Sequence, residues 1–167
     1  MEPGHIAKVY IASTLSNAER VSALAIALWQ AGQARGLDIT ITYDWTPGGY
    51  VPDDQPDLKR SVAIKELLGV LNAHVLLVVM PGERGSHFEF GVAYAVQKPI
   101  VLLLDRHDGR SPSFHFLDNI VRAHREDDAI DAVLDLLVRP PALDRPDDKH
   151  LMTRLLEGTT DDQCHHD

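Results

Sequence analysis

Glu89 is a lone carboxylate in a long apolar segment. Residues 75–80 and 100–104 are rich in Val, Ile and Leu without alternation, and residues 86–97 between them carry apolar side chains on almost every face. A carboxylate at the start of such a helix is held ionised by the helix N-terminus, although it is poorly solvated. An ionised, poorly solvated carboxylate is a nucleophile suited to glycosidic chemistry. The residue and its setting therefore indicate a candidate catalytic group.

The sequence around Glu89 also fits a purely structural role. Ser86 and Glu89 match the S-x-x-E capping box, in which the glutamate closes onto the amide of the cap residue. Gly82 and Gly85, in the polar loop before the helix, would let a substrate approach the backbone closely. Both interpretations of Glu89 stay open at this point.

Other side chains that could bind or react stand where predicted strands end. Tyr10 lies near the end of the first apolar run, Asp44 follows the second and Glu83 follows the third. Because ligands bind outside the carboxyl ends of parallel strands, these three side chains are expected to gather on one rim with Glu89. Trp45, next to Asp44, either stacks on a base or anchors its loop.

The elements that must position these residues alternate along the chain. Strands are predicted at residues 6–12, 38–43, 75–80, 100–104 and 119–123, and helices at 18–34, 58–71, 86–97 and 127–137. This alternation predicts an α/β fold with a mostly parallel sheet covered by helices on both faces. Five strands with this spacing suit a flavodoxin-like doubly wound sandwich with the strand order 2-1-3-4-5. A short helix at residues 149–157 is also expected.

Length and composition limit the kinds of protein that this chain can be. Its 167 residues fit one domain, placed at residues 1–138, followed by a charged, proline-containing tail at residues 139–167. The net charge of −9 argues against a nucleic-acid-binding protein. No apolar run reaches the ~20 residues of a membrane span, and no signal-peptide pattern opens the chain. The single cysteine, Cys164, excludes internal disulfides, so a cytoplasmic location is expected.

Neither a metal site nor a cofactor site is indicated. His107, His115 and His124 are too irregularly spaced for a metal site, and the sequence Cys-His-His at residues 164–166 falls in the tail. The chain has no G-K-[ST] sequence of the kind that binds nucleotide phosphates. The turn after the first predicted strand lacks the G-x-G-x-x-G fingerprint of dinucleotide-binding folds.

Four segments resemble the nucleoside 2-deoxyribosyltransferase superfamily. They are VYIAS (residues 9–13), ELLGVLNA (66–73), GSHFEFGVA (85–93) and the Lys-Pro pair at 98–99. The similarity covers roughly residues 6–137, and the block around Glu89 is its most specific part. It implies that Glu89 is the nucleophile, that Tyr10 holds it in place and that Glu66 orients the sugar. Glu66 departs from the aspartate of the family and reaches one methylene further.

The resemblance implies an enzyme that cleaves or transfers the N-glycosidic bond of a (2-deoxy)nucleoside through a covalent glycosyl-glutamate intermediate. Hydrolysis of 2'-deoxynucleoside 5'-monophosphates, known in the same superfamily, is an alternative, and so is a non-catalytic nucleotide-binding module on this fold. The expected ligands are a nucleoside or nucleoside monophosphate and a free nucleobase, without a cofactor. A homodimer or larger assembly is also implied, in which Phe114, His115 and Phe116 could complete the site of a neighbouring subunit.

Substrate contacts are expected from the loops at the strand ends. Thr14, Ser16 and Ser113 resemble the hydroxyls that hold the phosphate in the monophosphate hydrolases. Glu83 resembles an acid that meets the base in transferases of free nucleosides, and it would repel a phosphate. Alternatively, Glu83 is a solvated loop charge and the polar loops are ordinary turns. The residues expected to bind substrate are Ser13, Thr14, Ser16, Asp44, Trp45, Gly82, Glu83, Gly85, Ser86 and Ser113.

Overall fold

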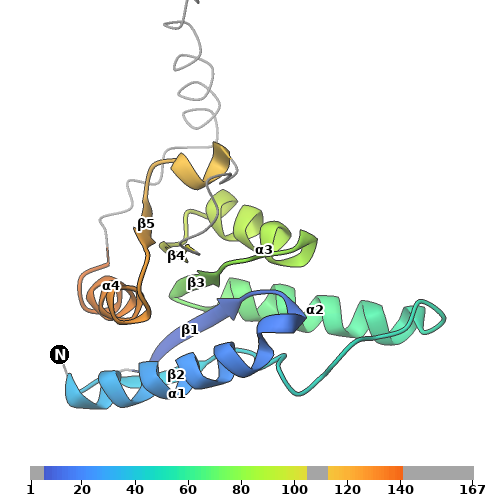
Figure 1. Ribbon diagram of the computed structural model, residues 1–167, viewed down its shortest axis with the longest axis horizontal. Helices are drawn as coiled ribbons and strands as arrows, with labels where there is room; N and C mark the ends of the chain where they lie inside the picture. Colours follow the sequence, from blue (N-terminus) through green and yellow to red (C-terminus); the bar gives the residue numbers. More distant parts are fainter. Residues whose placement is uncertain (1–5, 105–112, 141–167) are drawn as a thin grey trace, which may run out of the picture.

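A five-stranded parallel sheet forms the centre of the molecule (Figure 1). The computed structural model describes residues 6–104 and 113–140. The strands are β1 (Ile6–Ala12), β2 (Asp38–Ile41), β3 (Val75–Val79), β4 (Ile100–Leu103) and β5 (Ile120–Ala123). Every neighbouring pair is parallel, in the order β2-β1-β3-β4-β5. The predicted flavodoxin-like α/β sandwich is therefore confirmed.

Two helices cover each face of the sheet (Figure 1). The helices are α1 (Ala18–Ala34), α2 (Pro56–Asn72), α3 (Arg84–Ala95) and α4 (Glu126–Val138), with short 3₁₀ turns η1 (Leu15–Asn17) and η2 (Ser113–Phe116). One apolar core joins the sheet to α1 and α4, and the other joins it to α2 and α3. Strands β3 and β4 are buried along their whole length, which explains their unbroken apolar sequences.

Helix α3 begins earlier than the sequence pattern predicts. Glu83 is its N-cap and Ser86 stands at the third helical position. The hydroxyl of Ser86 accepts the backbone N–H of Glu83 at 2.8 Å and donates to the carbonyl oxygen of Glu83 at 2.9 Å. Glu89 consequently lies in the second turn, beyond the positions that a capping box uses. The interpretation of Glu89 as a capping residue of Ser86 is wrong.

The apolar sequence of α3 predicts a largely buried helix, but part of its surface is exposed. Phe88 of this helix and Val96, the residue that caps its C-terminus, are 64% and 50% exposed. Neighbouring α2 exposes Ile64, Leu68 and Leu71, which follow one another at helical spacing along one side. Each of the two helices that pack over the same face of the sheet thus leaves an apolar row on the surface.

Several predictions from sequence fall outside the described residues. These are most of the loop at residues 105–113, the greater part of the tail beginning at residue 139, the helix expected at 149–157 and Cys164. In the part of the chain that the structure describes, no helix is both long enough and apolar enough to cross a membrane.

Candidate active site

A buried tyrosine and a buried glutamate meet above the centre of the sheet. Tyr10 lies on β1, where alternation along the strand directs Val9 and Ile11 toward α1 and turns Tyr10 toward α2 and α3. Glu89 lies on the inner side of α3, among the residues that the helix buries, and is 7% exposed. The hydroxyl of Tyr10 donates a hydrogen bond to Oε1 of Glu89. This contact joins two segments 79 residues apart in the sequence.

The expectation that the start of the helix holds Glu89 ionised is wrong, because Glu89 lies in the second turn of α3 and its burial disfavours the charged form. Burial raises the pKa of Glu89 to about 7, and the nearby charge of Glu66 acts in the same direction. The hydrogen bond from Tyr10 opposes both effects because it favours the ionised form. Burial, followed by the charge of Glu89, raises the pKa of Tyr10 far above its ordinary value, so the phenol stays protonated and can donate. Burial also raises the pKa of Glu66.

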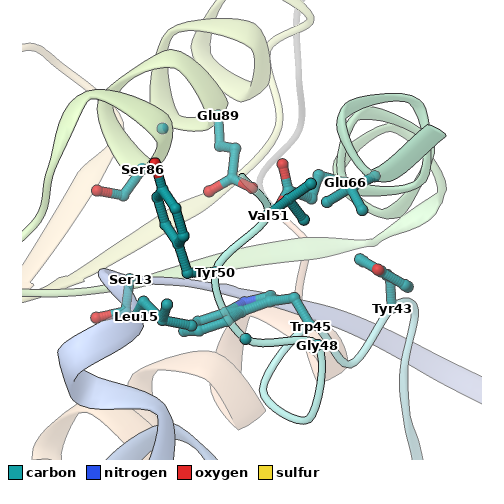
Figure 2. Close-up of a pocket in the computed structure, with 13 residues that line it drawn as sticks. Ser13, Leu15, Tyr43, Trp45, Gly48, Tyr50, Val51, Glu66, Ser86 and Glu89 are labelled. Atoms are coloured by element: carbon teal, nitrogen blue, oxygen red, sulfur yellow. The ribbon is translucent and has the colours of Figure 1, made fainter. Parts of the chain in front are cut away.

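A cavity of about 250 Å³ opens beside these side chains (Figure 2). Glu89 from α3 and Glu66 from α2 direct their carboxylates into it. Its lining residues come from the segment that follows β1, from α2 and α3, and from the loop between β2 and α2. They are Ser13, Leu15, Tyr43, Trp45, Gly48, Gly49, Tyr50, Val51, Val62, Glu66, Gly85, Ser86 and Glu89.

Two aromatic rings line the cavity, one across from Glu89 and one along the side (Figure 2). Trp45 lies across from Glu89, and its indole N–H donates to the carbonyl oxygen of Ile11 at 2.8 Å, which fixes the ring. Tyr50 stands on the loop between β2 and α2 with its ring along the cavity wall, and it is 73% exposed. The cavity thus combines two carboxylates with flat apolar surfaces suited to an aromatic ligand.

The structure brings together about half of the residues that the sequence singled out. Tyr10 sits behind Glu89, and the predicted residues that line the cavity are Ser13, Trp45, Glu66, Gly85, Ser86 and Glu89. The other predicted residues that the structure describes do not line it: Thr14, Ser16, Asp44, Gly82, Glu83 and Ser113. Glu83 is exposed at the start of α3.

Several polar groups near the cavity already have partners within the protein. The Ser13 hydroxyl donates to the carbonyl oxygen of Val79 at 2.8 Å and accepts from the Asn17 side chain at 2.9 Å. The Asp44 carboxylate accepts from the backbone N–H of Thr46 at 3.0 Å and from its hydroxyl at 2.6 Å. These contacts shape the loops after β1 and β2, so Ser13 and Asp44 have clear structural roles.

Seven of the residues that line the cavity were not singled out individually from the sequence. They are Leu15, Tyr43, Gly48, Gly49, Tyr50, Val51 and Val62. The length and composition of the loop after β2 indicate a functional segment, but its fold depends on distant contacts such as the bond from Trp45 to Ile11. Val62 could have been found, because it lies four residues before Glu66 and therefore on the same side of α2.

The arrangement can hold a nucleophile next to a flat ligand. None of the described residues lining the cavity is Lys, Arg or His, and two of them are glutamates. Within residues 6–104 and 113–140, no three His, Cys, Asp or Glu side chains gather in a way that could hold a metal ion. The chemistry that these side chains can support is nucleophilic attack by Glu89, oriented by Tyr10.

Two solved structures are similar to this chain. A conserved protein from Enterococcus faecalis V583 matches with a TM-score of 0.50 at 16% sequence identity, over 77% of this chain and 97% of that chain. A CMP N-glycosidase from Clostridium botulinum, BcmB, matches with a TM-score of 0.47 at 18% identity, over 77% of this chain and 98% of that chain. The first of these matches shows a shared fold. No protein-family model and no curated protein sequence matches the chain.

Proposed function

We propose that this protein cleaves the N-glycosidic bond of a nucleoside, with Glu89 as the nucleophile. The observation that carries the proposal is the Glu89 carboxylate, buried in the wall of a cavity and held by the Tyr10 hydroxyl. The resemblance of the segments around Tyr10, Glu66 and Glu89 to the nucleoside 2-deoxyribosyltransferase superfamily supports the same chemistry.

The reaction proceeds in two displacements at the anomeric carbon. The Tyr10 hydroxyl donates its hydrogen bond to Oε1 of Glu89, so Oε2 remains free to attack the anomeric carbon. As the new C–O bond forms, the C–N bond breaks and the base leaves with the electron pair and takes up a proton. Water or a second base then attacks the anomeric carbon from the opposite side, breaks its bond to the Glu89 oxygen and releases a proton, which balances the one taken up by the departing base. Two inversions give net retention at the anomeric carbon. Water makes the protein a hydrolase, and a second base makes it a transferase.

The remaining lining residues have complementary roles in this proposal. Glu66 accepts hydrogen bonds from sugar hydroxyls, because its carboxylate faces the same space as Glu89. Trp45 and Tyr50 offer ring faces on which a nucleobase can stack. The sugar then lies between the two carboxylates, and the base lies toward the rings of Trp45 and Tyr50.

The charge of the cavity favours a nucleoside over a nucleoside monophosphate. Its two carboxylates would repel a phosphate, and no cationic side chain stands among the described lining residues. The hydroxyls expected to hold a phosphate, those of Thr14, Ser16 and Ser113, do not line the cavity. We therefore propose an uncharged substrate of the nucleoside class.

Base release from matched substrates tests this function. Purified protein is incubated with nucleosides and with their 5'-monophosphates, with and without a second free base, and the products are separated by chromatography. We expect free base, or an exchanged nucleoside, from at least one nucleoside, at a rate more than about tenfold above that on its monophosphate, or about 1.4 kcal/mol. Faster turnover of the monophosphates would contradict the proposed substrate class.

Two variants link the activity to Glu89. Glu89→Gln should stay folded and lose several orders of magnitude in turnover, because the amide oxygen carries no negative charge. Glu19→Gln, the same change at an exposed position on α1, is the matched control and should keep the wild-type rate. Folding of both is checked by circular dichroism. Release of base by folded Glu89→Gln at the wild-type rate would overturn the proposal.

A further inference from the structure

Gly69 lies where helix α2 comes closest to the tyrosine of the candidate site. A Cβ atom added at Gly69 would lie 2.8 Å from both Cδ2 and Cε2 of Tyr10 and 3.0 Å from Cβ of Tyr43. Carbon atoms do not approach so closely, so a side chain at this position would require one of its neighbours to move. The ring of Tyr10 therefore packs directly against the backbone of α2 at Gly69.

Neither the α2 backbone at Gly69 nor the β1 backbone at Tyr10 can easily move apart, so the Tyr10 side chain would have to give way. The carbonyl oxygen of Gly69 accepts the hydroxyl of Thr42 at 2.8 Å and the backbone N–H of Ala73 at 3.2 Å, which holds α2 down on the sheet. Tyr10 is fully buried, and its strand pairs with β2 on one side and β3 on the other. A methyl group at Gly69 would therefore displace the tyrosine ring.

Displacement of the ring would act directly on the proposed nucleophile. The hydroxyl at the far end of the Tyr10 ring donates to Oε1 of Glu89. Glu66 stands one helical turn before Gly69, on the same side of α2. The spacing between α2 and β1 at Gly69 thus sets the positions of both side chains that accompany Glu89.

We propose that Gly69 is a positioning residue of the candidate site: its lack of a side chain seats the Tyr10 ring against α2 and so holds the phenol on Glu89. The importance of this contact for catalysis rests on the proposed function. The positioning itself is a property of the folded protein, so it can be measured without any substrate.

The titration of Glu89 reports on the position of the Tyr10 hydroxyl. The groups that face Glu89 are Tyr10 from β1, whose hydrogen bond lowers its pKa, and Glu66 from α2, whose charge raises it. Selective ¹³C labelling of glutamate carboxyl groups allows the titration to be followed by NMR, and Glu89→Gln identifies the resonance. We expect Gly69→Ala to move the titration of Glu89 to higher pH, as Tyr10→Phe does.

Two further variants make the experiment specific. Gly91→Ala, the same change on α3 at a position with open space around it, should leave the titration unchanged. In the Tyr10→Phe background, Gly69→Ala should add no further upward shift, because the hydrogen bond is already gone. A folded Gly69→Ala variant in which Glu89 titrates as in the wild type would overturn the proposal.

Activity is the second readout. If the proposed function holds, Gly69→Ala should lower kcat by about 10-fold to 10²-fold, approaching Tyr10→Phe, with a smaller change in KM. If no substrate is cleaved by the wild type, the NMR titration still decides whether Gly69 positions Tyr10. Failure of the proposed function and failure of this inference are therefore distinguishable.

If Gly69→Ala does not fold, unfolding measurements on variants without the tyrosine ring show whether the Tyr10 contact is the reason. The two closest contacts of the added Cβ are with the Tyr10 ring and the third is with Cβ of Tyr43, so Gly69→Ala in a Tyr10→Leu background should fold and should cost clearly less stability than it does with the ring present. Denaturant titrations of these variants give the comparison. An equal cost of Gly69→Ala with and without the tyrosine ring would show that Gly69 is needed for some other reason.

Discussion

At the scale of single residues, the candidate site consists of one phenol and two carboxylates, and both Tyr10 and Glu66 shift the pKa of Glu89. Burial raises the pKa of Glu89 to about 7, so a large fraction of the side chain is protonated near neutral pH. Only the ionised form can attack the anomeric carbon. The rate should therefore rise with pH through about 7 and level off above it.

Substitutions of the two neighbours should move this pH dependence in opposite directions. The hydrogen bond from Tyr10 lowers the pKa of Glu89, so Tyr10→Phe should shift the rise in kcat/KM to higher pH. The charge of Glu66 raises the same pKa, so Glu66→Gln should shift the rise to lower pH. Tyr10→Phe should also reduce the plateau by about 10²-fold because it removes an orienting bond. Rate profiles between about pH 5 and 9 measure both effects, and shifts of equal sign would contradict this assignment.

At the scale of elements, the sequence predicts the sheet better than it predicts the starts of helices. Apolar runs such as Val75–Val79 specify buried strands directly, because both of their faces are covered. The start of α3 is two residues off, because Ser86 and Glu89 imitate a capping box while Ser86 actually bonds to Glu83. Local patterns cannot distinguish two hydrogen-bonding arrangements that use the same serine.

The sequence likewise predicts some residues of the candidate site and not others. Placement of Tyr10 and Glu89 on one rim follows from the rule that parallel strands end at one edge of the sheet. Glu66 lies on a helix and is indicated by the resemblance alone. The position of Tyr50 depends on how the loop after β2 folds, and that loop is anchored by long-range contacts such as the bond from Trp45 to Ile11. Such contacts leave no periodic pattern in the sequence.

Lys98 should stabilise the end of helix α2. Its ammonium group donates to the carbonyl oxygens of Leu71, at 3.3 Å, and Ala73, which terminate that helix. Lys98→Met keeps much of the side-chain volume but removes these bonds, so the free energy of unfolding should fall by about 1 kcal/mol. Lys65→Met, on the exposed side of α2, is the control and should change it little. Urea denaturation compares the two, and equal stabilities would contradict a capping role.

At the scale of the whole molecule, the exposed apolar rows on α2 and α3 fit the expectation of a homodimer or larger assembly. Leu68 and Phe88 are 50% and 64% exposed and lie on helices that contact each other, and apolar side chains gathered on one surface mark interaction sites. Phe114 and Phe116, expected from the sequence to face a neighbouring subunit, are also exposed, whereas His115 is buried.

Light scattering tests the assembly. We expect a mass at least twice the 18.5 kDa of the chain. Leu68→Glu and Phe88→Glu should reduce it to that of a single chain, since they place charges on the apolar rows. Ile26→Glu, at an exposed apolar position on α1, should leave the assembly intact. A wild-type protein that is monomeric at working concentration would refute the expectation.

The proposed reaction binds a sugar covalently to Glu89, and that intermediate can be trapped. Fluorine at C2 of the sugar slows both displacements by destabilising their oxocarbenium-like transition states. The protein is incubated with the 2-fluoro analogue of a nucleoside that it cleaves, digested, and analysed by peptide mass spectrometry. We expect a fluorosugar adduct on the peptide that contains Glu89, at the glutamate itself, and none on Glu89→Gln. An adduct on a different residue of the wild type, or release of base from the analogue with the Glu89 peptide unmodified, would contradict it.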